Sequence, residues 1–428
     1  MTYVNDVSAS APQRAELEEV RMRAPESLTA QRLLDPQMWN EPADFYRQLL
    51  DEAPVWRVPG VDLVVVSSFD AVTEAVRRPQ DFSSNLRSVI YRDDDGAPAL
   101  TDIGIGDGTD VLATADPPAH AEHRAMVFPN LVARRMKELR PSVDRMAAEF
   151  MDPPVAAGSF EFMSAVANAI PIRVVARLIG FVDDDPDDLL AAAFDSTGML
   201  AAGSLDDTLA AMARAAEILD WMNDQVTDAV ANGRDGLLGL AADAVRSGEL
   251  DVSLALVMMH TLLSAGGEST TSLLGNAVEI LATLPDVQEA VRAEPELLTP
   301  FIEEVLRLES PFRYHLRLAR NETELDGIPV PAGSSVMLLW AAANRDPSRF
   351  ETPDELRLDR EFPRDHVGFG RGIHLCVGAP LARIEADAVL GRLLTTTSWV
   401  TLGDRQPLRE ESLMVRRLEQ LDISVQPA

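Results

Sequence analysis

The chain has 428 residues, 46% of them hydrophobic, which is enough to build a substantial core. Its formal net charge of −31 would repel nucleic acid and anionic membrane surfaces. The single cysteine excludes an intramolecular disulfide and fits a reducing cytoplasm. No signal-peptide pattern is present at the N-terminus. We therefore expect a cytoplasmic protein with a flexible tail over 1–25 and a single domain over 26–428.

The first ordered elements are predicted to be short. A helix is indicated over 41–53, two strands around a Pro-Gly turn over 55–68, and another short helix directly after them. The following stretch, 82–115, is rich in glycine and aspartate and has little periodicity, so we expect a long loop there. Its "DDDG" run at 93–96 lacks the closing glutamate of a calcium loop, and we interpret it as solvated.

From about 118 to 310 the apolar residues recur three and four positions apart, which indicates helices. The longest predicted helix runs from Leu250 to Leu284 and would span about 50 Å. Its apolar stretch is too short and interrupted to cross a bilayer. Gly266 and Gly267 each weaken a helix by roughly 1 kcal/mol relative to alanine. Close packing of a neighbouring helix would explain them, and so would a local distortion beside a functional site.

Beyond this region the pattern changes again. Short strands are expected over 325–341, a poorly periodic segment over 345–365, a helix over 377–396 and hairpins in the last 30 residues. The predicted fold class is therefore mainly α with small β-sheets.

The only cysteine lies in "HVGFGRGIHLCVG", residues 366–378. The glycines permit left-handed backbone and close approach of a ligand. Cys376 is predicted to lie near the N-terminus of the next helix, where backbone N–H groups and the helix dipole should lower the pKa of the thiol. From these residues alone, a buried structural cysteine remains an alternative to a metal ligand. The G-x-G-x-x-G spacing of a nucleotide-binding loop is not met.

Five stretches in the chain resemble the cytochrome P450 superfamily. The pattern Phe369-x-x-Gly372-x-x-x-Cys376-x-Gly378 resembles its haem-binding signature, and "EEVLR" at 303–307 resembles its E-x-x-R helix. "AGGESTT" at 265–271, "DPPAHAEHR" at 116–124 and "NRDPSRF" at 344–350 resemble three further family segments. The resemblance extends from about residue 40 to 425. It implies the P450 fold, with haem b between the long central helix and the helix that follows the cysteine loop.

The resemblance also implies roles for individual residues. Cys376 would be the axial iron ligand. Glu268, Ser269 and Thr270 would deliver protons to dioxygen, and Ser269 stands where the family usually has threonine. We therefore expect weaker control of proton delivery and some uncoupled release of peroxide. The other residues implied to contact the haem are His120, Arg124, Ala265, Gly266, Arg317, Phe369, Gly370, His374 and Gly378.

Glu304 and Arg307 lie one helical turn apart and can form an ion pair. The resemblance implies a buried network that a second arginine closes. Glu355 stands where that arginine is expected, so Arg357 and Arg360 are the candidates to replace it.

As a P450, the protein would insert one oxygen atom of O2 into a hydrophobic small molecule, by hydroxylation or epoxidation, in secondary metabolism. The sequence shows no flavin or NAD segment, so an external ferredoxin with an NAD(P)H-dependent reductase would supply the electrons. The basic run Arg134, Arg135, Lys137 and Arg140 would attract such an acidic carrier. A monomer is expected.

Substrate contacts are expected from apolar residues, with Arg313 and His315 as candidates to meet a polar substrate group. The apolar candidates are Leu86, Met258, Met259, Leu262, Phe312, Leu316, Met414 and Val415. Three other interpretations remain open. They are a peroxide-using or oxidative-coupling haem-thiolate enzyme, a haem-based binding or sensor protein, and a helical protein without haem.

Overall fold

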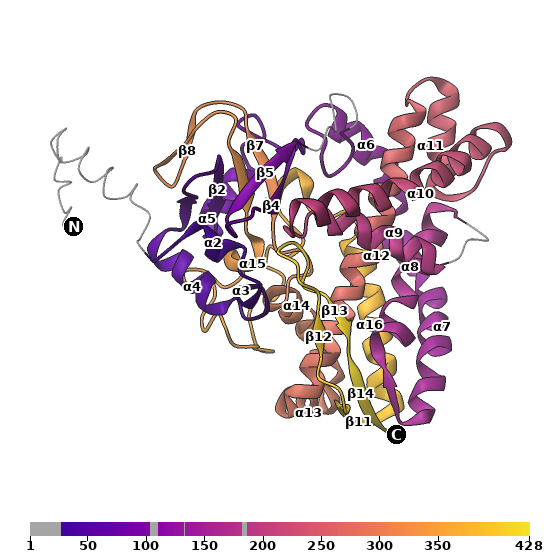
Figure 1. Ribbon diagram of the computed structural model, residues 1–428. Helices are drawn as coiled ribbons and strands as arrows, with labels where there is room; N and C mark the ends of the chain where they lie inside the picture. Colours follow the sequence, from indigo (N-terminus) through magenta and orange to yellow (C-terminus); the bar gives the residue numbers. More distant parts are fainter. Residues whose placement is uncertain (1–26, 103–109, 132, 182–185) are drawn as a thin grey trace, which may run out of the picture.

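The computed structural model describes residues 27–102, 110–131, 133–181 and 186–428. The predicted tail over 1–25 lies outside these residues. The chain is mainly helical with small sheets, as the sequence predicts (Figure 1). The described α-helices are α2 (Ala30–Leu33), α3 (Pro36–Asn40), α4 (Ala43–Glu52), α5 (Phe69–Val76), α6 (Ala119–Val127), α7 (Ala133–Ala157), α8 (Ala169–Ile179), α9 (Pro186–Gly198), α10 (Leu205–Asn232), α11 (Gly236–Ser247), α12 (Val252–Thr283), α13 (Pro285–Ala293), α14 (Leu298–Leu308), α15 (Trp340–Ala343) and α16 (Ala379–Thr396).

The long central helix, α12, begins and ends close to its predicted bounds and continues through both glycines. A Cβ atom on Gly266 would lie 2.8 Å from Val175 Cγ2, and one on Gly267 would lie 3.0 Å from Ile172 Cδ1. Both neighbours belong to α8. Close packing of α8 on α12 therefore explains the glycines, and the alternative of a distorted helix is wrong.

The largest sheet has five strands in the order β1-β2-β10-β7-β3. Strand β10 runs parallel to β2 and antiparallel to β7, with Arg317 of β7 opposite Val336 of β10. His315 and Arg317 are two residues apart on β7, so their side chains point to the same face of the sheet. The strands are β1 (Val55–Arg57), β2 (Leu63–Val66), β3 (Phe82–Ser83), β7 (His315–Ala319) and β10 (Ser335–Leu338).

The prediction of a long loop over 82–115 is partly wrong, because the described part of this stretch contains β3 and a hairpin. Strands β4 (Ser88–Arg92) and β5 (Pro98–Asp102) pair in antiparallel register. Asp93 Oδ1 accepts hydrogen bonds from the backbone N–H groups of Asp95 and Ala97, so this carboxylate closes the turn. Aspartates are common in turns for this reason. Among the described residues, no group of three or more His, Cys, Asp or Glu side chains is placed to hold a metal ion.

The remaining strands form smaller sheets. One has the order β11-β14-β6 and the others are single pairs. These strands are β6 (Ser159–Glu161), β8 (Thr323–Leu325), β9 (Ile328–Val330), β11 (Thr397–Leu402), β12 (Leu408–Arg409), β13 (Leu418–Gln420) and β14 (Asp422–Pro427).

The main hydrophobic core joins α7, α8, α12, α14 and α16. Figure 1 shows α12 and α16 side by side in this body, while the N-terminal strands and short helices gather on its other side. Within the described ranges, no helix has the length and apolar character needed to cross a membrane. The cysteine loop leads directly into α16, so the packing of α16 against α12 fixes the position of this loop relative to the central helix.

Candidate active site

A cavity of about 250 Å³ lies between α12 and the cysteine loop. Every residue predicted to hold the cofactor lines it, together with Ser269 and Thr270 of the central helix. Segments distant in the sequence meet here: α6, α8, α12, β7 and the start of α16. The predicted residues in the lining are His120, Arg124, Ala265, Gly266, Arg317, Phe369, Gly370, His374, Cys376 and Gly378.

Cys376 faces this cavity and is enclosed by protein on its other sides, so its accessible surface is the surface toward the cavity. Gly370 and Gly372 adopt φ values of +67° and +72°, which glycine reaches without strain. The turn they form lets the N–H of Cys376 donate to the carbonyl oxygen of Phe369 at 2.9 Å.

The predicted lowering of the Cys376 pKa is wrong for the protein chain alone. Burial raises the pKa of the thiol, and this effect outweighs the backbone N–H groups of Gly378 and Ala379, which lower it. A thiol that coordinates a metal ion is deprotonated outright, so an iron at this position would favour the thiolate that the helix N-terminus does not secure by itself.

Hydrogen-bond donors gather on one wall of the cavity. The rings of His120 and His374 lie 4.2 Å apart between centroids, and Ser84 Oγ lies 2.9 Å from His374 Nε2. The side chains of His374 and Arg317 are buried by the surrounding protein. This burial lowers the pKa of His374 to about 3 and the pKa of Arg317 to about 10. Arg124 donates to the carbonyl oxygen of Leu375 at 2.9 Å and so holds the cysteine loop.

His315 joins this wall, although the sequence suggested a contact with substrate. Its Nδ1 accepts a hydrogen bond from Trp340 Nε1 at 2.8 Å, which leaves Nε2 as the donor. Burial lowers the pKa of His315 to about 3. Because His315 and Arg317 share a face of β7, the wall presents several buried donors to a ligand with carboxylates. The two propionates of haem b fit this donor set, and the Cys376 sulfur fits its iron.

The predicted buried ion pair is present. Glu304 accepts from Arg307 Nε at 2.7 Å and from its terminal nitrogen at 2.9 Å. Arg360 is the side chain that closes the network, with its Nε 2.9 Å from Glu304 Oε1, while Arg357 contributes only its backbone N–H. Burial raises the pKa of Glu304, and the arginine hydrogen bonds overcome this, so the pKa is lowered overall. Glu355 also takes part, through its carbonyl oxygen, which accepts from Arg307.

A second buried carboxylate, Glu303, was not identified from the sequence. It lies 3.0 Å from His366 Nε2 and 2.7 Å from Arg383 Nε. These partners lower its pKa to about 2, although burial acts in the opposite direction. The Arg383 guanidinium also lies 4.6 Å from the centroid of the Phe369 ring. Glu303 thus ties α14 to the start of the cysteine loop, at His366, and to α16 directly after the loop, at Arg383. The doubled glutamate in "EEVLR" was the available signal.

Of the three residues predicted to handle protons, two line the cavity and the third is buried away from it. Ser269 and Thr270 line the cavity, and Ser269 Oγ donates to the carbonyl oxygen of Ala265 at 2.6 Å. Glu268 is fully buried away from the lining. It accepts from Thr197 Oγ1 at 2.9 Å and from Arg417 Nε at 2.7 Å. Burial outweighs both partners and raises the pKa of Glu268 to about 7.

Glu385 is a further lining residue that the sequence did not reveal. It is 2% exposed, and its Oε2 has no hydrogen-bond partner in the described parts of the chain. Burial raises its pKa well above the ordinary value. This shift favours the neutral carboxyl, which can donate a proton.

Only some of the residues predicted to contact substrate line the cavity. Leu262 and Phe312 line the cavity. Met258 and Met259 are fully buried in the core formed with α8 and α11. The remaining candidates pack in the N-terminal core instead: Leu86, Leu316, Met414 and Val415. Apolar side chains that the sequence did not single out complete the lining, including Leu112, Leu178, Ile179, Leu237 and Trp340. Arg313 is 3% exposed and is not among the lining residues described.

The basic run on α7 is described only in part. The side chains of Arg134 and Arg135 lie outside the described residues. Arg140 forms ion pairs with Asp144 and Asp387, each at 2.6 Å, and Lys137 is exposed. Arg140 therefore contributes less free positive charge than the sequence suggests.

Comparison with known proteins agrees with this geometry. A family model for cytochrome P450 matches residues 216–423. Cytochrome P450 144 of Mycobacterium tuberculosis is 45% identical over 388 residues, which cover 90% of this chain and 89% of the relative. The vitamin D(3) 25-hydroxylase of Pseudonocardia autotrophica is 30% identical over 91% of this chain and 95% of its own.

The fold comparison leads to the same family. A cytochrome P450 from Bacillus megaterium, solved in complex with testosterone, superposes with a TM-score of 0.80 at 26% identity, over 91% of this chain and 99% of that one. The cavity presents a cysteine for iron and buried donors for two propionates, so the residues present fit haem b. The chain therefore belongs to the cytochrome P450 family, and the protein is a P450 monooxygenase that binds haem b.

Proposed function

We propose that this enzyme uses dioxygen to hydroxylate a hydrophobic small molecule with electrons from a separate ferredoxin and reductase. The observation that carries the proposal is the cavity itself. It combines Cys376, a wall of buried donors and the hydroxyls of Ser269 and Thr270 with mainly apolar surroundings. The proposal takes residues 26–428 as one catalytic domain that works as a monomer.

When bound, haem with a thiolate ligand supplies the electron density that favours O–O cleavage. The chain's own residues exclude water and orient the substrate. Leu262 and Phe312, with Leu178 and Ile179, would hold an apolar substrate on the α12 side of the cavity, where Ser269 and Thr270 also lie. Burial of apolar surface at about 25 cal/mol per Å² would supply the binding energy.

Protons would reach the cavity through the Glu268 region. Because burial raises its pKa to about 7, Glu268 populates both protonation states near neutral pH. Arg417 joins Glu268 to Glu410, whose carboxylate lies 2.8 Å from the arginine and is 28% exposed. This chain leads from the surface to the buried acid, and rotation of the Glu268 side chain toward Ser269 would complete the transfer.

The electron carrier would bind through charge attraction to the basic run on α7. Arg134→Glu with Arg135→Glu is expected to raise the KM for ferredoxin, most strongly at low salt, because steering by exposed charges is screened by ions. An unchanged KM at low salt would contradict this assignment.

Substrate class is tested by screening the haem-loaded enzyme for a change in iron spin state on binding. Vitamin D3 and testosterone are the first probes, because a relative and a structural neighbour carry these names, followed by terpenoids, macrolides and fatty acids. A binder is then incubated with ferredoxin, reductase, NADPH and ¹⁸O-labelled O2. One ¹⁸O atom per product molecule is expected. Product formed only with added hydrogen peroxide would favour a peroxide-using enzyme instead.

A further inference from the structure

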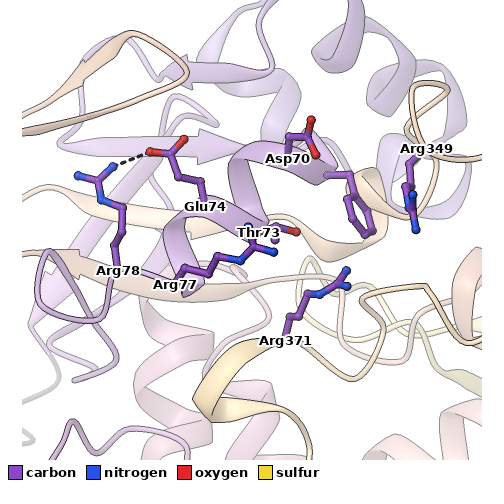
Figure 2. A pocket seen from close by; sticks show the side chains of 8 residues that line it. Asp70, Thr73, Glu74, Arg77, Arg78, Arg349 and Arg371 are labelled. Carbon is purple, nitrogen blue, oxygen red and sulfur yellow. Dashed lines mark hydrogen bonds and ion pairs between the residues drawn. The ribbon is translucent and has the colours of Figure 1, made fainter.

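A second pocket, about 410 Å³ in volume, lies beside helix α5 and shares one lining residue, Arg371, with the main cavity (Figure 2). Four arginines come together in it: Arg77, Arg78, Arg349 and Arg371. Arg77 and Arg78 directly follow α5, whereas Arg371 lies in the cysteine loop, five residues before the iron ligand. Four arginines around one pocket are unexpected in a chain with a net charge of −31.

Two polar groups of the pocket have no partner among residues 27–102, 110–131, 133–181 and 186–428. Thr73 is 6% exposed, and its hydroxyl makes no hydrogen bond within the described part of the chain. Arg77 forms no ion pair with any described residue. Figure 2 shows Thr73 on α5 in the same pocket as the side chains of Arg77 and Arg371, which come from different elements. A buried hydroxyl without a partner is costly, so a ligand that accepts its hydrogen bond would be stabilised there.

The remaining charges leave the pocket positive at this point. Arg78 forms ion pairs with Glu74 at 2.6 Å and with Asp81 at 2.9 Å, so the negative charge of Glu74 is balanced. Arg349 is paired with Asp365, which Arg371 reaches only at 3.5 Å. Asp70 is the other carboxylate of the lining, and it is exposed to solvent. Arg77 and Arg371 are thus the guanidinium groups with capacity for a ligand.

An aromatic ring keeps two of the arginines in place. The guanidinium groups of Arg349 and Arg371 both lie 5.4 Å from the centroid of the Phe69 ring. Cation–π contact of this kind orients a guanidinium without occupying its N–H donors. Apart from its long contact with Asp365, the donors of Arg371 therefore remain available to an anion.

We propose that this pocket binds the phosphate group of a small phosphorylated molecule. Arg77 and Arg371 would contact the phosphate oxygens, and the Thr73 hydroxyl would donate to one of them. Planar guanidinium donors arriving from two sides suit an oxyanion with several acceptor oxygens. The pocket volume exceeds what a phosphate fills, so it also admits part of the organic group.

The site would link α5 to the cysteine loop. These elements already touch closely, since a Cβ atom on Gly372 would lie 3.0 Å from the carbonyl oxygen of Val76. A phosphate held by Arg77 of one element and Arg371 of the other would fasten this contact. Occupancy is therefore expected to shift the haem Soret band slightly, because Cys376 lies in the same loop.

The test is titration calorimetry of the full-length haem-loaded protein with pyrophosphate and glycerol 3-phosphate at constant ionic strength. Binding is expected to weaken about tenfold or more in Arg77→Gln and in Thr73→Val, since a charge-assisted hydrogen bond is lost in each. Thr73→Ser keeps the hydroxyl and should bind as the natural protein does. Arg145→Gln, which removes an exposed arginine on α7, is the matched control and should change nothing.

The reduced carbon monoxide spectrum of each variant checks that it folds and keeps its haem. Equal, weak binding in all variants would mean general attraction to anions and would overturn the proposal. No phosphate binding, together with a raised KM for ferredoxin in Arg77→Gln, would assign the pocket to a carboxylate of a protein partner and would also overturn it.

Discussion

The Glu268→Gln substitution is predicted to flatten the pH dependence of the unfolding free energy between pH 5 and 8. Burial raises the pKa of Glu268 to about 7 from its ordinary value of 4.5. The folded state therefore prefers the protonated carboxyl. The stability from this preference is fully present below pH 4.5 and is lost as the pH rises through 7. The gap between the two pKa values corresponds to about 3 kcal/mol.

This prediction is measured by urea unfolding of haem-loaded protein at pH 5, 6, 7 and 8, followed by circular dichroism. The variant should gain about 2–3 kcal/mol relative to the natural protein across this range, because glutamine carries no titrating proton. Glu410→Gln, which alters another partner of Arg417 at a more exposed position, should leave most of the pH dependence in place. A constant difference between Glu268→Gln and the natural protein from pH 5 to 8 would refute the reasoning.

Three further predictions follow from the central helix and the buried ion-pair network. Ser269→Ala should raise the hydrogen peroxide released per NADPH consumed several-fold, because the hydroxyl that lines the cavity is lost, whereas Ser269→Thr should lower it; unchanged coupling in the alanine variant would exclude this role. Arg360→Gln should lower the unfolding free energy by about 2–3 kcal/mol, because a charged hydrogen bond to a buried carboxylate is removed. Arg357→Gln loses only exposed ion pairs of its side chain and should cost much less than Arg360→Gln, so equal losses in urea unfolding would contradict the assignment. Gly266→Ala should cost about 1–3 kcal/mol through the clash with Val175, and Val175→Ala in the same chain should recover part of it; a stabilised single variant would show that the packing is not tight.

The residues around the cofactor cavity were predictable because they lie in short local motifs. Phe369, His374 and Cys376 share one loop, and its glycines mark the turns that loop needs. His120 and Arg124 are four residues apart on one helix, so they face the same direction. In such cases the spacing along the chain determines the arrangement in space.

Residues that depend on packing between distant segments were not predictable in this way. Met258, Met259 and Leu262 are all apolar on α12, and only the position of the neighbouring helices decides that Leu262 alone of the three faces the cavity. Likewise, the contact of Glu268 with Arg417 joins residues 149 positions apart. The pKa of Cys376 also depends on burial, which local sequence does not determine.

The choice between Arg357 and Arg360 shows the same limit. Both lie in a segment without regular structure, where no periodicity tells which side chain points inward. Only the fold shows that Arg360 reaches Glu304, whereas the Arg357 side chain turns to Asp359 and Glu351 at the surface.

The central claim is that Cys376 ligates haem iron through its sulfur. The most direct measurement is the absorption spectrum of the purified, reduced protein under carbon monoxide. The natural protein should show the far-red-shifted Soret band of a thiolate ligand, and Cys376→His should bind haem without that shift. A colourless protein, or the same shifted band in Cys376→His, would contradict the account.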